Sequence, residues 1–316
     1  MTDDQGTGDG KRRRPLNVGL QLPEAERVVP WQEMAAMARL AEDIGFDSLW
    51  IGDHLLYRGP GEEPRGPWEA WSLLAALAAV TTRVALGPFV ACALFHNPAI
   101  LAKKAATIDE ISGGRLILGL GAGWHEPEFA AYGVPFDHRV SRFEEAFTII
   151  RTLLRQGEID FAGRYYTARE CVLVPRGPRP EGPPLMVGSL GERMLRITLP
   201  YVQMWNAWYA DYGNDWRKLP AILERLDRAC LAVGRDPASL QRSVAVLIAL
   251  PGGTGRWSVD PADDRAAPLR GTPAQIAEEL RGFARVGVHH VQVVLDPITP
   301  KAIETMAPVL EALGQG

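Results

Sequence analysis

Short β-type runs and longer helical segments alternate along almost the whole chain, and this alternation restricts the fold more than any other feature. The expected strands cover residues 16–20, 48–51, 84–90, 116–120, 185–187, 204–206, 243–250 and 291–295. The expected helices cover residues 31–44, 68–80, 98–111, 139–156, 192–199, 216–233, 273–285 and 300–313. Such alternation is typical of parallel βαβ units. Eight strands, each followed by a helix, predict a single α/β domain, a (β/α)8 TIM barrel.

Two segments do not follow the alternation. Residues 159–174 form two β-type halves around Gly163 and predict a hairpin outside the barrel. Residues 251–272 are rich in Gly, Pro, Asp and Arg and predict a mobile loop at the barrel mouth. We expect one domain over residues 15–316 and a disordered polar tail over residues 1–14.

Composition excludes several classes of protein. With 47% hydrophobic residues the chain can bury a large core, and its net charge of −4 gives nucleic acid no general attraction. Three scattered cysteines do not suggest a disulfide framework, and no apolar stretch reaches the ~20 residues of a membrane span. The sequence therefore predicts a cytosolic protein with no nucleic-acid or membrane partner.

The active site of a (β/α)8 barrel lies at the carboxyl ends of its strands, so the residues after each strand are the first candidates. Glycines and aromatic side chains dominate there, with few charges, which suits a flat aromatic cofactor with a phosphate better than a metal. The candidates are Asp53, His54, Phe89, Val90, Gly121, Gly123, Trp124, Gly188, Ser189, Arg193, Trp208 and Tyr209.

Other chemistries find little support at these positions. No lysine stands where a Schiff-base aldolase needs one, and no GxSxG motif is present for a serine hydrolase. His54, His125 and Asp296 form only a weak set of metal ligands, so we predict no metal site. The glycine run 119–123 lacks the third glycine of a Rossmann motif, because Trp124 stands in its place.

Two of the candidates have both a functional and a structural interpretation. The segment 188–193 could bind phosphate through backbone N–H groups with help from Arg193, or it could be an ordinary capped loop before a helix. His54 could be a packed or surface histidine, but its place directly after a strand and beside Asp53 favours a catalytic role.

At these residues the sequence resembles the bacterial luciferase-like monooxygenase superfamily, in its F420-dependent oxidoreductase branch. The segments that carry the resemblance are residues 41–54 (AEDIGFDSLWIGDH) and residues 101–124, which include Ser112-Gly113-Gly114-Arg115-Leu116. The resemblance implies a (β/α)8 barrel that uses the deazaflavin coenzyme F420 or FMN.

The resemblance also implies roles for single residues. Asp53 and His54 correspond to an Asp-His pair of the family, and in F420-dependent members that histidine lies near the reactive deazaflavin carbon. A non-prolyl cis peptide behind the cofactor ring would fall near Phe89–Val90, and the cofactor phosphate would lie at Gly188 and Ser189. The chain departs from F420-dependent sugar-phosphate dehydrogenases at Trp124, where those proteins have a glutamate, and this argues against their glucose 6-phosphate reaction.

The sequence thus predicts an oxidoreductase that transfers hydride between F420 and a small, largely apolar organic substrate. His54 and Asp53 are the predicted catalytic residues, and Trp124, Trp208 and Tyr209 are predicted to form the wall of the substrate pocket. Two alternatives stay open: an FMN-dependent monooxygenase that uses reduced flavin and O₂, and a flavin-binding protein without turnover. A homodimer is an expectation from the resemblance.

Overall fold

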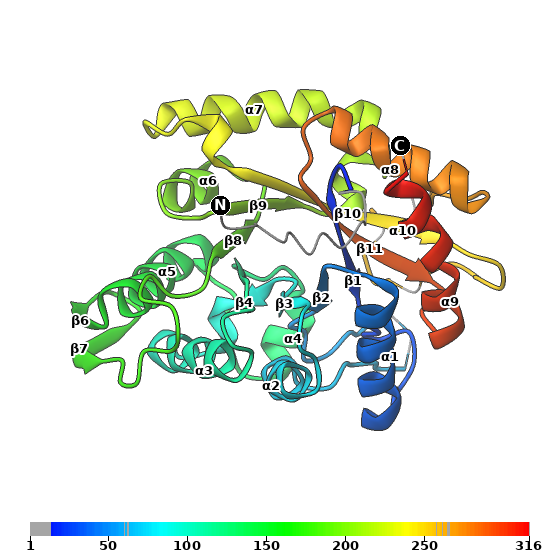
Figure 1. Ribbon diagram of the computed structural model, residues 1–316. Coiled ribbons are helices and arrows are strands. Elements are labelled where there is room, and N and C mark those ends of the chain that lie inside the picture. Colours follow the sequence, from blue (N-terminus) through cyan, green and yellow to red (C-terminus); the bar gives the residue numbers. More distant parts are fainter. Residues whose placement is uncertain are drawn as a thin grey trace, which may run out of the picture.

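The chain folds into a barrel of parallel strands surrounded by helices (Figure 1). The computed structural model describes residues 14–59, 61, 63–256, 258–260, 262–263 and 266–315. The strands of the barrel sheet are β1 (Asn17–Gln21), β2 (Ser48–Ile51), β3 (Ala85–Pro88), β4 (Ala91–Cys92), β5 (Leu118–Gly121), β8 (Leu185–Gly188), β9 (Met204–Ala207), β10 (Gln241–Ala249) and β11 (His290–Asp296). The predicted strands are all present.

The order of the strands shows how the barrel closes. The sheet runs β3-β2-β1-β11-β10-β9-β8-β5-β4. β3 and β4 are two parts of one barrel strand, which is interrupted at Phe89–Val90. β4 pairs with β5, and Leu86 of β3 bridges in parallel to Leu116 just before β5, so the two ends of the sheet meet. The predicted (β/α)8 barrel is confirmed, with the predicted strand 84–90 divided in two.

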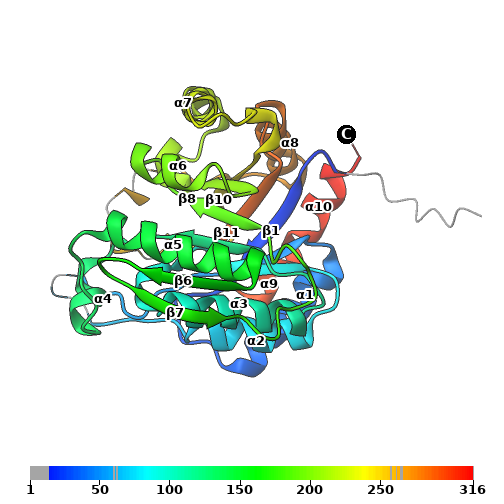
Figure 2. The ribbon, with the colours of Figure 1, turned by 90° about the vertical axis from the view of Figure 1, so that its left-hand side faces the viewer.

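The outer layer consists of helices that follow the strands (Figures 1 and 2). They are α1 (Trp31–Ile44), α2 (Ala70–Val80), α3 (Pro98–Ile111), α5 (Arg139–Gln156), α6 (Glu192–Thr198), α7 (Leu219–Ala232), α8 (Pro273–Arg285), α9 (Pro300–Thr305) and α10 (Ala307–Leu313). The predicted final helix is divided at Met306. One short helix, α4 (Glu126–Ala131), was not predicted.

Local signals in the sequence set several helix ends. The Asn97 side chain accepts hydrogen bonds from the Ala99 and Ile100 amides and so begins α3. Thr272 forms a capping box with Gln275 at the start of α8. Gly45 ends α1 with a φ of 102°, a left-handed conformation that favours glycine. No helix within the described part of the chain has both the length and the apolar character needed to cross a membrane.

The predicted hairpin is present outside the barrel. β6 (Glu158–Ala162) and β7 (Thr167–Val172) pair in antiparallel fashion and lie beside α5 (Figures 1 and 2). The next predicted irregular segment, 251–272, returns to the barrel at Leu269, which pairs with Ile248 of β10. Trp257, Pro261, Asp264 and Arg265 lie outside the described residues, and the mobility of this loop stays a prediction.

The amino-terminal tail was predicted for residues 1–14, of which residues 1–13 lie outside the described residues. Arg14 itself is tied to the barrel: its guanidinium donates to the Asp47 carboxylate at 2.8 Å and to the Gly45 carbonyl. The Asp47 carboxylate also accepts a hydrogen bond from the Val18 amide of β1. This aspartate therefore links the start of the chain, β1 and the turn before β2.

The inside of the barrel combines a small apolar cluster with polar groups that hydrogen-bond to each other. Trp50, Met186 and Met204 form the cluster against Phe89 and Val90. From β2 and β11, Ser48 Oγ and His290 Nε2 lie 2.8 Å apart, and the Trp50 indole donates to the same hydroxyl. From β9, Asn206 donates to Ser243 and Gln292. These contacts link side chains of five barrel strands inside the barrel.

Candidate active site

Two adjoining cavities lie at the carboxyl ends of the barrel strands. The larger, which we call the cleft, measures about 430 Å³ and reaches from Asp53 to Gly188 and Ser189. The smaller, which we call the chamber, measures about 250 Å³ and lies toward Glu24 and Arg256. Both are lined by His54, Phe89, Trp124, Trp208 and Asp211. These five residues therefore mark the boundary between the two spaces.

Two glycines of the cleft lie directly against the Val90 side chain. The peptide bond Phe89–Val90 is cis, at the position that the family resemblance implies. A Cβ at Gly121 would come within 2.9 Å of a Val90 methyl, and a Cβ at Gly188 within 3.3 Å. Backbone and Val90 thus form a surface on which a planar ring can lie.

At the far end of the cleft, polar groups surround a small space. Gly188, Ser189 and Arg139 line it, and Arg139 donates to the Gly123 carbonyl at 2.6 Å. Arg139 is the only arginine or lysine among the described residues that line the cleft. Gly123 has a φ of 73°, and a Cβ there would lie 2.5 Å from the Phe129 ring. Arg139 was not predicted from the sequence, because it lies at the start of α5 and not after a strand.

His54 lies between the cleft and the chamber, and a buried glutamate orients it. Its Nδ1 lies 2.9 Å from Glu128 Oε1, and Glu128 Oε2 accepts a hydrogen bond from the Leu55 amide at 3.0 Å. The Glu128 side chain is only 1% exposed. An ionised carboxylate at this position favours the tautomer with the proton on Nδ1. His54 Nε2 makes no hydrogen bond with the described residues, so it is free to meet a ligand.

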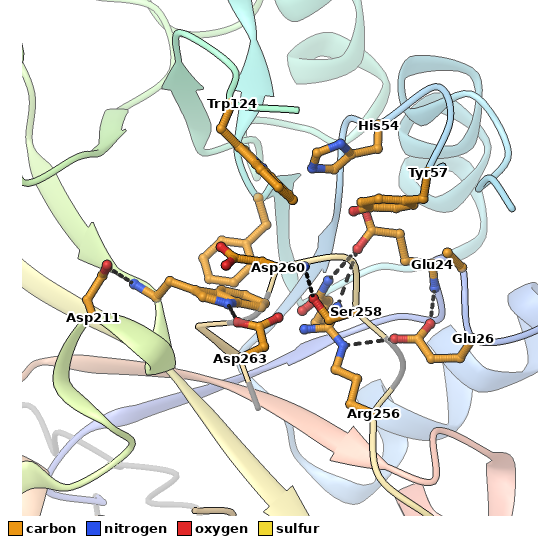
Figure 3. A pocket seen from close by; sticks show the side chains of 14 residues that line it. Glu24, Glu26, His54, Tyr57, Trp124, Asp211, Arg256, Ser258, Asp260 and Asp263 are labelled. Atoms are coloured by element: carbon orange, nitrogen blue, oxygen red, sulfur yellow. Dashed lines mark hydrogen bonds and ion pairs between the residues drawn. The ribbon is translucent and has the colours of Figure 1, made fainter. Parts of the chain in front are cut away.

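The environment of His54 favours its charged form. Burial alone would lower the pKa of His54, but the hydrogen bond to Glu128 and the negative charges of Glu24, Glu128 and Asp53 raise it above the ordinary value. The ring lies between Tyr57, with centroids 4.5 Å apart, and Trp124, with centroids 5.6 Å apart (Figure 3). These contacts limit its rotation.

Asp53 has a different position from its neighbour. Its carboxylate is buried and accepts a hydrogen bond from the Cys92 amide at 3.0 Å, while His96 Nε2 lies 3.1 Å from the same oxygen. Asp53 lines the cleft and holds β4 in place behind it. Its geometry is that of a residue that supports the cleft and adds negative charge near His54.

The chamber is lined by several charged side chains (Figure 3). Arg256 donates to Glu26 at 3.0 Å, and its guanidinium also lies 3.5 Å from Glu24. The Tyr57 hydroxyl donates to Glu24 at 2.9 Å. Burial raises the pKa of Glu24 above its ordinary value, although the positive charges of His54 and Arg256 oppose the effect. Our prediction of a largely apolar substrate does not fit this lining.

Further carboxylates and one amide oxygen complete the chamber. Asp260 and Asp263 come from the segment after β10, and Asp263 accepts a hydrogen bond from the Trp208 indole at 2.7 Å. Gln21 Oε1 is buried and has no hydrogen-bond partner among the described residues. A ligand with hydrogen-bond donors would satisfy these acceptors.

The structure brings together most of the residues predicted from the sequence and separates two of them from the cavities. Trp124 and Trp208 line both spaces. Tyr209 is buried behind Trp208, with ring centroids 4.4 Å apart, and its hydroxyl faces Arg256. Arg193 lies outside the cleft, where it pairs with Glu144 at 2.8 Å. Neither Tyr209 nor Arg193 lines the two cavities.

Three residues of the site, Glu24, Glu128 and Arg256, were not predicted from the sequence. Glu24 follows the first strand closely, so the rule about strand ends should have included it. Glu128 is on the short helix α4, and nothing in its local pattern indicates that it pairs with a residue 74 positions away. No group of three or more metal-binding side chains occurs within the described ranges.

Comparison with known proteins identifies the family of this barrel. The profile of the luciferase-like monooxygenase family matches residues 15–251. The chain therefore belongs to the luciferase-like monooxygenase family, as its sequence motifs predicted. The oxidoreductase class predicted from the sequence is also confirmed, because the similar proteins are reductases, dehydrogenases and monooxygenases.

Three curated relatives show the range of the family. A phthiodiolone/phenolphthiodiolone dimycocerosates ketoreductase of Mycobacterium bovis is 31% identical over 84% of this chain and 72% of its own length. A 5,10-methylenetetrahydromethanopterin reductase of Archaeoglobus fulgidus is 34% identical, but the match covers only 53% of this chain and 46% of that protein. The pyrimidine monooxygenase RutA of Rhizobium rhizogenes is 33% identical over 63% of this chain and 55% of its own.

Solved structures support the fold. An F420-dependent secondary alcohol dehydrogenase, solved with an F420-acetone adduct, superposes with a TM-score of 0.79 over 94% of this chain and 99% of that chain. The monooxygenase RslO1 of Streptomyces bottropensis gives 0.73 over 93% of this chain and 98% of its own. At 18% and 20% identity, these two likenesses describe the barrel and not the reaction.

Proposed function

We propose that this protein is an F420-dependent oxidoreductase that transfers hydride between the deazaflavin and a small organic substrate. The cleft holds the cofactor, with its ring on Val90 and the flanking glycines and its phosphate near Gly188, Ser189 and Arg139. The substrate occupies the chamber. The cytosolic location and the homodimer stay predictions.

The dimensions and lining of the cleft fit such a cofactor. Its volume of about 430 Å³ lies within the ~300–1,000 Å³ of small-molecule sites. Gly121 and Gly188 leave room for the Val90 side chain, whose methyl groups lie against both residues and would carry the ring. The single arginine at the far end supplies the charge that a phosphate requires.

The position of His54 is the observation that carries the proposal. When bound, F420 supplies or accepts a hydride at one ring carbon. Reduction of a carbonyl also consumes one proton, and His54 can donate it from Nε2 to the developing alkoxide, while Nδ1–H stays bound to Glu128. In the direction of oxidation, neutral His54 accepts the proton of the alcohol at the same atom.

The chamber determines which substrates fit beside His54. Its carboxylates and the unpartnered Gln21 Oε1 favour a substrate that carries hydrogen-bond donors or a positive charge. Trp124 and Trp208 provide apolar walls at the boundary with the cleft. In place of the largely apolar substrate expected from the sequence, we propose a small carbonyl or alcohol compound that also bears a hydrogen-bond donor.

An FMN-dependent monooxygenase is the second candidate. The similarity to the pyrimidine monooxygenase RutA favours it. FMN would use the same surface at Val90 and the same phosphate end, so the cleft alone does not separate the two cofactors. The position of His54 at the boundary of cleft and chamber favours the F420 reaction.

Anaerobic titration of the purified protein with F420 and with FMN tests the proposal. Binding is followed by the quenching of cofactor and tryptophan emission, since Trp50, Trp124 and Trp208 lie at or below the cleft. We expect saturable binding of F420 and little response to FMN. Tight binding of FMN with no response to F420 would refute the choice of cofactor.

A histidine variant then tests the mechanism. We expect His54→Asn to retain F420 binding and to lose about 100-fold or more of the turnover of a carbonyl substrate. The matched control, His138→Asn, changes an exposed histidine whose left-handed backbone asparagine tolerates. Full activity of His54→Asn would remove the histidine from the mechanism. A wild type that binds F420 but turns over no substrate would instead support a binding protein without turnover.

A further inference from the structure

A third cavity, on the outside of the barrel, adjoins the cleft and is rich in arginine. It measures about 640 Å³ and lies between α6 and α7, which run next to each other on one side of the barrel (Figures 1 and 2). Apolar side chains of both helices, together with Leu190 and Trp205, line it. Arg193 and Arg196 of α6 and Arg225 and Arg228 of α7 line its edges. We call this space the arginine groove.

The groove is strongly positive although the chain is acidic. Glu192 is the only carboxylate among its described lining residues, against four arginines, whereas the whole chain carries a net charge of −4. Arg196 and Arg225 have no hydrogen bond or ion pair with any residue in the described ranges. Such a concentration of uncompensated positive charge favours an anionic ligand.

The other two arginines form only exposed ion pairs within the protein. Arg193 pairs with Glu144 at 2.8 Å, but both side chains are about half exposed. Arg228 lies 4.0 Å from Glu224 in the same helix, and these side chains are also exposed. Exposed pairs of this kind contribute little to stability, so these arginines can turn to an incoming anion at small cost.

Leu190 connects the arginine groove to the cleft. This residue lines both cavities, and it directly follows Gly188 and Ser189, which end the cleft. A ligand with its phosphate at Ser189 would need to extend past only this one residue to reach the groove. The occupant of the groove should be a continuation of the molecule in the cleft.

We propose that the arginine groove binds the oligocarboxylate tail that F420 carries beyond its phosphate. This tail consists of lactate and glutamate units, whose carboxylates suit guanidinium groups spaced along a groove. FMN ends at its phosphate and has no such extension, so the groove would also favour F420 over FMN. The inference rests on the proposed function, because it assumes F420 in the cleft.

A double variant with two forms of the cofactor tests this inference. Arg196→Gln/Arg225→Gln removes the two arginines without internal partners, and Arg169→Gln in the exposed hairpin is the control for a change of charge. Each protein is titrated with F420 that has its glutamate tail and with the same cofactor after the glutamates have been removed. Thermal unfolding verifies that the variants remain folded.

We expect the double variant to bind tailed F420 about 3- to 30-fold more weakly, as two solvated charge contacts allow, and to bind the truncated form as the wild type does. The wild type should lose its preference for the tailed form at high salt. If the double variant binds both forms more weakly by the same factor, or binds both as the wild type does, the inference is overturned while the proposal that F420 binds in the cleft still stands. If the wild type binds neither form, the proposed function itself fails, and the inference with it.

Discussion

Replacement of Glu128 by glutamine removes one negative charge beside His54 and keeps the shape of the side chain. The wild-type carboxylate accepts from His54 Nδ1 through Oε1 and from the Leu55 amide through Oε2. Glutamine has only one acceptor oxygen for these two donors. Its oxygen can keep the Leu55 amide if its NH₂ group turns toward His54. His54 Nδ1 must then accept a hydrogen bond, and a neutral His54 carries its proton on Nε2.

The size of the effect follows from the geometry. Opposite unit charges about 4 Å apart attract by about 4 kcal/mol at an effective dielectric constant near 20. Opposite charges within ~4–6 Å shift a pKa by about 1–3 units. Glu24 and Asp53 still favour the charged imidazole in the variant, while burial continues to oppose it. We therefore expect the pKa of His54 to fall by about 1–2 units in Glu128→Gln.

The titration of the His54 ring can be measured without knowledge of the substrate. The carbon–proton correlation spectrum of the six histidines is recorded against pH, and the His54 signal is assigned through its loss in His54→Gln. The control is Glu126→Gln, an exposed residue in the same helix. The wild-type midpoint should lie above the ordinary histidine value. A midpoint unchanged in Glu128→Gln would refute the coupling of the two side chains.

Three further substitutions test the barrel and the chamber. Arg115→Ala removes a guanidinium that donates to four oxygens at the end of α2 and in the turn after it. We expect the free energy of unfolding, measured in urea, to fall by about 2 kcal/mol. The control Arg169→Ala, which breaks an exposed ion pair, should lower it by about 0.5 kcal/mol. Arg256→Met leaves Glu24 buried without its positive partner, and we expect about 3 kcal/mol of destabilisation at neutral pH that shrinks as the pH falls and the carboxyl is protonated. Burial lowers the pKa of His290 to about 4, so the unfolded chain binds a proton that the folded chain does not. The free energy of unfolding should therefore fall by about 1.4 kcal/mol per pH unit between about pH 6.5 and the pKa of His290 in the folded state, about 4. A parallel pH series of His290→Gln should lack this contribution to the slope.

The barrel could be predicted from the sequence because each of its strands leaves a local signal. Parallel strands covered on both faces are short apolar runs, and the helices between them show a different period. The helix α4 was missed because six residues are too few for a helical period to be visible. The interruption of the third strand at Phe89–Val90 came from the family resemblance, since no local pattern marks it.

The candidate site could be predicted only in part, because pairs of residues distant in the chain create its chemistry. The strand-end rule identified His54, but its orientation depends on Glu128, and the charge of the chamber depends on Arg256. Arg256 lies 232 positions from Glu24, in a segment with no regular period. Which side chains meet across such separations depends on loop conformation, and that information is not local.

The motifs that identify the family mostly stabilise the barrel. Asp109 is buried and paired with Arg179, and Arg115 binds the end of α2. Asp47 anchors β1, while Ser48 and Trp50 fill the barrel interior. The sequence resemblance is therefore a strong argument for the barrel and for the position of the cleft. It is a weak argument for the substrate, because the chamber also depends on loop residues outside those motifs.

The division between cleft and chamber suggests where the specificity of this protein lies. Apart from Glu128, Arg139 and Val140, the cleft is lined mostly by residues at or just after strand ends, which leaves little freedom for change without loss of the barrel. The chamber contains Arg256 and Asp263, which come from the long segment after β10. Asp263 also holds the indole of Trp208, a wall shared by both cavities. Substitutions in this segment should thus alter the choice of substrate before they alter the choice of cofactor, since the segment lines the chamber and meets the cleft only at shared boundary residues such as Trp208.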